Sequence, residues 1–219
     1  MHGWIHDMLE RMMIEESGLA VWETIKSQAG CEDVPVGQWK LLGDYPDAMT
    51  LALVRTVCSV LSESGEAFLE RFGRFFMVST HKQGYSNLLA CQGQTLRSWL
   101  NNVNELHEHL KRTLSDSFVF PELYCSDDPS CDDADEDSFL LHYSSKREAT
   151  LAPLVVGIVK DVAEYYFSLQ ISMLTVSLQG GSDGSKCSTW KIRRTSRLVS
   201  ESNDASDEKR NNIWTKLEE

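Results

Sequence analysis

The spacing of the apolar residues over the first half of the chain constrains the fold more than any other feature of this sequence. From residue 1 to about 112, apolar side chains recur every three or four residues and seldom alternate one by one. That interval matches the turn of an α-helix, so it predicts a series of amphipathic helices. The clearest apolar stripes cover residues 4–12, 48–61 and 67–78, and Tyr45-Pro46-Asp47 suits the start of the second.

The second half of the chain follows a different pattern. Residues 115–137 have no helical period and contain two prolines. After them the pattern predicts a strand over 138–147, a helix over 154–167, a strand over 169–178 and a returning strand over 186–194. A change of phase between Met173 and Leu174 predicts a bulge or a bend in the strand over 169–178.

A helical half followed by a small antiparallel sheet is an α+β fold, and we expect a helical N-terminal half packed on that sheet. The composition becomes polar near residue 195. We therefore predict one domain over residues 1–194 and a flexible tail or linker over residues 195–219.

Composition and charge narrow the classes of function. The chain has 219 residues, of which 42% are hydrophobic and 25% charged, as in ordinary globular proteins. Its net charge of −12 disfavours nucleic acid and anionic lipid as partners. The longest apolar run, residues 151–159, is too short to span a membrane, and no signal peptide is visible. Six scattered cysteines favour free thiols in a reducing cytosol, so we expect a cytoplasmic protein.

Seven carboxylates crowd into residues 127–137. Like charges at this density repel one another and remain hydrated, which favours a solvated loop. The order of residues that a calcium-binding EF-hand loop needs is absent, so we do not expect calcium here.

His107 is a candidate metal ligand. It lies on the apolar face of a helix expected over residues 94–112, whereas His109 points elsewhere. An inward histidine on such a face is most often a hydrogen-bonded core residue, although imidazole is also a common metal ligand.

Three polar residues alternate along the strand expected over 138–147. Tyr143, Ser145 and Arg147 share one face of it and would present two hydroxyl groups and a guanidinium group to one place. That set suits a ligand with carboxylates, because arginine binds a carboxylate through two parallel hydrogen bonds. The alternative is a solvated polar strand face.

Together these features resemble the haem nitric oxide/oxygen-binding (H-NOX) domain, the sensor of soluble guanylate cyclases and of bacterial stand-alone sensors. The similarity covers roughly residues 1–180, with every block in order. It rests on the opening Met-His-Gly, similar to the family's Met-Tyr-Gly, and on residues 21–26, 45–47, 72–76, 84–89, 99–107 and 141–148, followed by Gly157.

The resemblance implies a role for each candidate residue. His107 would bind the iron of haem b, and Tyr143, Ser145 and Arg147 would bind the haem propionates. Pro121 would press on the porphyrin, although its spacing from His107 is one residue longer than usual in the family.

The gas-binding side of the haem would be apolar. Oxygen-binding relatives carry a tyrosine that stabilises bound oxygen, and the matching position here is Leu154, or Ala152 by an alternative count. The other residues implied for this side, Ile5, Phe76 and Ile158, are also apolar. We therefore expect a sensor that binds nitric oxide, and also carbon monoxide, and discriminates against oxygen.

The resemblance also implies a way of signalling. Nitric oxide would release His107 from the iron and free the helix that carries it. Asn104 departs from the family, in which many members have aspartate three residues before the ligand. The coupling between gas binding and movement of this helix is therefore expected to differ in this chain.

The resemblance leaves two candidates for the enzyme that the domain would regulate. The favoured hypothesis is that the chain is the regulatory domain of a soluble guanylate cyclase, without an active site of its own. The alternative is a stand-alone sensor of a histidine kinase or cyclic-di-GMP enzyme. A haem-free helical interaction module is a third possibility, and redox sensing through Cys125 and Cys131 rests only on their spacing. No motif of a hydrolase, metalloprotease or phosphate-binding loop is present.

Overall fold

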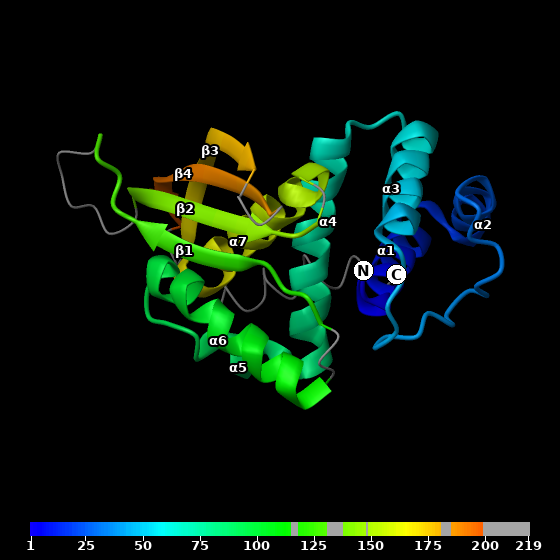
Figure 1. The fold of residues 1–219 in the computed structure, drawn as a ribbon, viewed down its shortest axis with the longest axis horizontal. Coiled ribbons are helices and arrows are strands. Elements are labelled where there is room, and N and C mark those ends of the chain that lie inside the picture. Colours follow the sequence, from blue (N-terminus) through cyan, green and yellow to red (C-terminus); the bar gives the residue numbers. More distant parts are fainter. Residues whose placement is uncertain (115–117, 131–137, 148, 181–184, 199–219) are drawn as a thin grey trace.

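The helices come first along the chain, as the apolar spacing predicts. The computed structural model describes residues 1–114, 118–130, 138–147, 149–180 and 185–198 (Figure 1). A π-helical turn, η1, over His81–Tyr85 separates α4 from α5. The helices of this half are α1 (Gly3–Ser17), α2 (Leu19–Gln28), α3 (Asp47–Leu61), α4 (Gly65–Thr80), α5 (Ser86–Ala90) and α6 (Leu96–Leu114).

The second half forms one antiparallel sheet of four strands, β1 (Glu122–Ser126), β2 (Ser138–Ser145), β3 (Leu169–Gly180) and β4 (Lys186–Arg197). Their order across the sheet is β1-β2-β4-β3. A short 3-10 turn, η2 (Ala149–Leu151), and helix α7 (Ala152–Phe167) connect β2 to β3. The α+β prediction is therefore confirmed.

Helix α4 lies between two apolar cores (Figure 1). The N-terminal core packs α1, α2 and α3 around buried side chains such as Trp22 and Phe68. The sheet core packs α6 and α7 on the inner face of the strands, around Phe139 and Trp190. Phe76 of α4 packs against both cores, so the boundary between them runs beside it.

Two expectations about the sheet are wrong in detail. Strand β4 continues through Arg197, three residues beyond the end predicted for this strand at residue 194. These polar residues stay in the strand because they bond to β3: Thr195 Oγ1 donates to the Gln170 carbonyl at 3.0 Å. The rest of the predicted tail, from residue 199, lies outside the described residues.

The irregularities of β3 lie at Gln170/Ile171 and Thr175/Ser177, rather than between Met173 and Leu174. The apolar pattern misplaced the bulge because Leu174, Val176 and Leu178 are 58%, 57% and 67% exposed, so apolar character does not follow burial on this edge strand.

Two other predictions fall partly outside the described residues. Of the seven carboxylates in the acidic loop, only those of Asp127 and Asp128 are described, and Cys131 is not described.

Among the residues that the structure does describe, no helix has the length and apolar composition that a membrane crossing requires.

Candidate functional site

A cavity of about 210 Å³ lies where the two cores meet. Its walls come from α1, α4, α6 and α7, from β2, and from the segment that leads into β1. The lining includes every side chain predicted for the site: Ile5, Phe76, His107, Pro121, Tyr143, Ser145, Arg147, Leu154 and Ile158. Residues from five distant parts of the sequence thus face one space, although the role of each stays a prediction.

His107 reaches this cavity from α6. Burial lowers the pKa of its imidazole to about 4, against a smaller opposing effect of the Pro121 backbone, so the ring is neutral near pH 7. Its ring lies parallel to that of Phe120, with centroids 4.4 Å apart, and its Nδ1 atom has no hydrogen-bond partner. His109 is exposed, as the helical spacing predicts. A neutral imidazole with an unused ring nitrogen is the form that binds metals.

Asparagine side chains attach this helix to the edge of the sheet. Asn104 Nδ2 donates to the Leu123 carbonyl at 2.7 Å, and the Leu123 amide donates back to Asn104 Oδ1 at 3.1 Å. One turn earlier, Asn101 Oδ1 accepts from the Cys125 amide at 2.8 Å. We call these three bonds the asparagine clip. β1 is an edge strand, so no neighbouring strand bonds to its backbone on that side. The clip satisfies these backbone groups instead.

The clip also explains the departure at position 104. Asparagine carries both a donor and an acceptor, so it matches the two backbone groups of Leu123. An ionised aspartate carries acceptors only and would place a charge against the Leu123 carbonyl.

The opposite wall is formed by α4 and α7, which approach backbone to backbone. A Cβ atom added at Gly157 would lie 1.9 Å from the Glu70 carbonyl oxygen, and one at Gly73 would lie 2.1 Å from that of Leu154. Ion pairs flank this contact, with Arg74 bonded to both carboxylate oxygens of Glu164 at 2.9 Å. Phe76, Leu154 and Ile158 face the cavity from these two helices.

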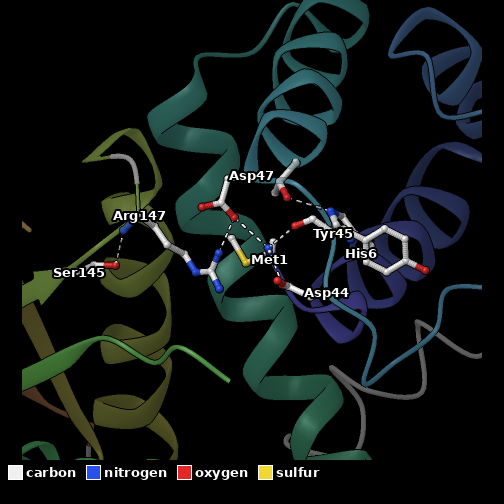
Figure 2. Close-up of polar contacts among 8 residues, drawn as sticks. Met1, His6, Asp44, Tyr45, Asp47, Ser145 and Arg147 are labelled. Atoms are coloured by element: carbon white, nitrogen blue, oxygen red, sulfur yellow. Dashed lines mark hydrogen bonds and ion pairs between the residues drawn. The ribbon is translucent and has the colours of Figure 1, made fainter. Parts of the chain in front are cut away.

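Charged groups lie at one rim of the cavity, and Figure 2 shows the contacts among them. Arg147 forms an ion pair with Asp47, and Asp47 also accepts a hydrogen bond from the Met1 amine at 2.9 Å. Burial alone would raise the pKa of Asp47, but the amine and Arg147 together hold it below its ordinary value.

Arg147 lies two residues beyond the end of β2, so the prediction that it continues the strand is wrong. The chain bends after Ser145, whose Oγ accepts a hydrogen bond from the Arg147 amide at 3.1 Å. The bend turns the backbone away from the sheet, yet Tyr143, Ser145 and Arg147 all still line the cavity.

The sequence interpretation missed five ring side chains of the lining: His2, Trp4, Trp99, Phe118 and Phe120. The walls are therefore not wholly apolar. The available signal was the histidine at the second position, where the resemblance has tyrosine. Two positions match the tyrosine that stabilises bound oxygen in oxygen-binding relatives. Of these, Leu154 lines the cavity, whereas Ala152 is buried in the sheet core.

A comparison with protein families matches residues 2–175 to the Haem-NO-binding model. The chain belongs to the Haem-NO-binding family. It is thus a haem-binding gas-sensor domain related to soluble guanylate cyclases, as the resemblance implied.

Relatives of this Haem-NO-binding domain include soluble guanylate cyclases gcy-35 and gcy-34 of Caenorhabditis elegans. They are 28% and 27% identical over 177 and 176 residues, which cover 79% and 80% of this chain. Soluble guanylate cyclase 89Da of Drosophila melanogaster is 19% identical over 192 residues, or 88% of the chain. The chain spans about a quarter of the length of these relatives, at 24%, 24% and 27%.

Solved H-NOX structures share the fold of this Haem-NO-binding domain. A Cs H-NOX mutant with 4-cyano-L-phenylalanine at site 5 has a TM-score of 0.72 and 17% identity, covering 91% of this chain and 99% of that chain. An oxygen-binding H-NOX domain in its oxygen complex has a TM-score of 0.63 and 17% identity, covering 92% and 96%.

The residues present fit a haem chemically. His107 offers an unpartnered ring nitrogen, the walls are largely apolar, and the rim offers an arginine and two hydroxyl groups for carboxylates. The cavity is smaller than the roughly 300–1,000 Å³ of typical ligand pockets. A second cavity of about 520 Å³ shares with it His107, Ser145, Leu123 and residues 118–121, so this short segment forms the wall between the two.

Proposed function

We propose that this domain senses nitric oxide through haem b and discriminates against oxygen, with His107 as the iron ligand. The observation that carries the proposal is the position of His107, a neutral imidazole with an unpartnered nitrogen that lines the same cavity as Tyr143, Ser145 and Arg147. When bound, the haem supplies a ferrous iron that coordinates diatomic gases.

The charged rim would hold the haem carboxylates. Tyr143 and Ser145 each offer a hydroxyl donor, and Arg147 offers the compensating charge. Asp47 orients Arg147 from the outer side of the rim, where the two form an ion pair. Pro121 would pack against the porphyrin, since it lines both cavities at their shared wall.

The wall formed by Ile5, Phe76, Leu154 and Ile158 would receive the gas. Bound oxygen carries partial negative charge and needs a hydrogen-bond donor, and these four side chains provide none. Nitric oxide and carbon monoxide do not depend on such a donor, so both are expected to bind.

Signalling would proceed through release of His107 from the iron. Helix α6 would then be held on the sheet side by the asparagine clip and by apolar packing. The relatives named above favour a guanylate cyclase as the regulated enzyme. A stand-alone sensor of a histidine kinase or cyclic-di-GMP enzyme is the second candidate. A cytoplasmic location with free thiols stays a prediction.

The decisive experiment is an absorption spectrum of the anaerobically reduced, haemin-reconstituted protein, before and after nitric oxide and then after air. We expect a Soret band that shifts with nitric oxide and does not change with air. Absence of a Soret band would support the haem-free interaction module instead, and a stable oxygen complex would contradict the discrimination against oxygen.

Two variants assign the roles of the residues. In His107→Gly we expect haem to be lost, or to be retained only with added imidazole, while His109→Gly serves as the control on the same helix. An unchanged five-coordinate spectrum in His107→Gly would contradict the ligand assignment.

Leu154→Tyr introduces a hydroxyl group into the apolar wall and should permit an oxygen complex, which the same spectra would show.

A further inference from the structure

His2 is a buried polar group that the proposed function does not use. Its side chain lines the cavity, the residue is 6% exposed, and neither ring nitrogen has a hydrogen-bond partner. His6, one turn further along α1, differs, because its Nε2 is hydrogen-bonded to Thr50 Oγ1 at 2.9 Å. Leaving a buried polar group without a partner is unfavourable, which points to a partner that arrives with a ligand.

Hydrogen bonds fix the backbone on both sides of His2, and an aromatic ring packs against its side chain. His2 forms an isolated antiparallel bridge with Asp44, and the Gly3 amide donates to the Gly43 carbonyl at 2.9 Å. Phe118 covers the ring, with centroids 3.8 Å apart. The nitrogens are the only polar atoms of this side chain, and His2 lines a cavity whose walls are mostly apolar.

The surroundings of His2 connect it with the charged rim. Arg147, Asp44, Asp47 and the Met1 amine are all close enough to act on its ionisation, and burial, the largest of these effects, lowers its pKa. A neutral imidazole in this position offers one N–H donor. Arg147 is already paired with Asp47, so a donor from His2 would add to the hydroxyl groups of Tyr143 and Ser145 in binding two carboxylates.

We propose that His2 donates a hydrogen bond to a carboxylate of the bound haem, beside Arg147, and is thus a further cofactor-binding residue. This inference rests on the proposed function. It assigns the side chain by its unpartnered nitrogens and its place in the lining.

The test uses the haemin-reconstituted full chain and measures transfer of haemin to excess apomyoglobin. In His2→Phe the aromatic contact with Phe118 is kept and the donor is lost, so we expect haemin to leave roughly tenfold faster, the effect of one hydrogen bond to a charged group. His2→Gln restores a donor and should stay within about threefold of the parent. His109→Gln, at an exposed site on α6, should not change the rate.

Esterified haem makes the test specific for the carboxylates. With haemin dimethyl ester, which lacks carboxylate charge, the parent and His2→Phe should release haem at rates within about twofold. If His2→Phe speeds the loss of both forms equally, the ring only packs and the proposal is wrong. Equal rates for parent and variant with ordinary haemin would also overturn it.

Two spectra exclude other uses of His2. A six-coordinate low-spin ferrous spectrum in the parent that becomes five-coordinate in His2→Phe would make His2 an iron ligand. An oxygen complex lost in His2→Phe would make it a donor to the gas. Either result overturns the proposal while leaving haem binding intact, whereas a parent that binds no haem overturns the proposed function itself.

Discussion

The two helical walls of the cavity are held in different ways. On one side α4 and α7 touch backbone to backbone at Gly73 and Gly157, with ion pairs on either side. On the other side α6 meets β1 through the asparagine clip, in which side chains bond to the edge of a strand. The first contact depends on shape and tolerates no added atom, whereas the second consists of a few separable hydrogen bonds.

The two contacts would also be lost in different ways. Separating α4 from α7 would break close packing over both helices at once, which costs many small contacts together. Moving α6 away from β1 requires the loss of three hydrogen bonds, each worth about 1 kcal/mol net, and of the apolar packing of Trp99, Leu100 and Val103 in the sheet core. His107 therefore lies on a wall whose polar contacts with the sheet are few and can be broken one at a time.

The largest effect is expected from Gly157→Ala, which breaks the α4–α7 contact. The new Cβ would lie 1.9 Å from the Glu70 carbonyl oxygen, so the helices must separate. We expect a loss of about 4 kcal/mol or more in the free energy of unfolding, measured by urea denaturation. Gly65→Ala is the control, because a Cβ there meets nothing within 4 Å. Equal stability of the two variants would contradict the close approach.

The pH dependence of stability tests the same contact between α4 and α7 at Asp161. It lies on α7, and burial raises its pKa to about 7, partly opposed by Arg74. A carboxyl group with a raised folded-state pKa stabilises the fold below its unfolded pKa of 3.8, and this stabilisation is lost as the pH rises through about 7.

Asp161→Asn should remove that pH dependence. At pH 8 the variant should be more stable than the parent by at most about 3 kcal/mol once partial exposure is allowed for, and the gain should disappear near pH 4. Chemical denaturation across this range measures the difference, with Glu23→Gln at an exposed position of α2 as the control. A constant difference at every pH would argue against a raised pKa.

Asn104→Leu tests the other wall. The change leaves the amide and carbonyl groups of the buried Leu123 without their partner, so we expect a loss of about 1–3 kcal/mol in stability. The amide of Leu123 should also exchange its hydrogen faster, which hydrogen-exchange NMR would detect. Asn102→Leu removes only an exposed bond to the Gln92 carbonyl and is the matched control. Unchanged exchange at Leu123 in Asn104→Leu would contradict the clip.

The smallest effect is expected from Glu164→Gln. It weakens the bidentate pair with Arg74, but both side chains are about one-third exposed, at 39% and 33%. Partly solvated ion pairs contribute about 0–1 kcal/mol, and thermal unfolding should show no more than that. A larger loss would mean that the ion pairs, rather than the glycine contact, hold this wall together.

The apolar spacing was enough to predict the helices and the fold class, because helix and strand periods differ and each element buries one face. It placed His107 correctly for the same reason, since a helix fixes which positions face inward. The bulge in β3 was misplaced, because exposed apolar residues such as Leu174 break the link between pattern and burial.

Features that depend on contacts between distant segments could not be predicted. Arg147 leaves the strand because its backbone bonds to the Ser145 hydroxyl, a local alternative that alternation does not reveal. His2 enters the cavity only because the chain start pairs with Asp44. Three asparagines within residues 101–104 were a readable signal, since asparagine is unfavourable in a helix interior unless its side chain has a partner.

The asparagine clip also bears on how fast the protein can answer a stimulus. Three discrete bonds to one strand edge can open one after another, and each opening is a local event that leaves both apolar cores in place. Such local openings are far more frequent than global unfolding, and collective helix motions of this kind take microseconds to milliseconds. The asparagine clip can therefore open and close many times during the lifetime of the folded state, while the apolar side chains of α6 stay packed in the sheet core.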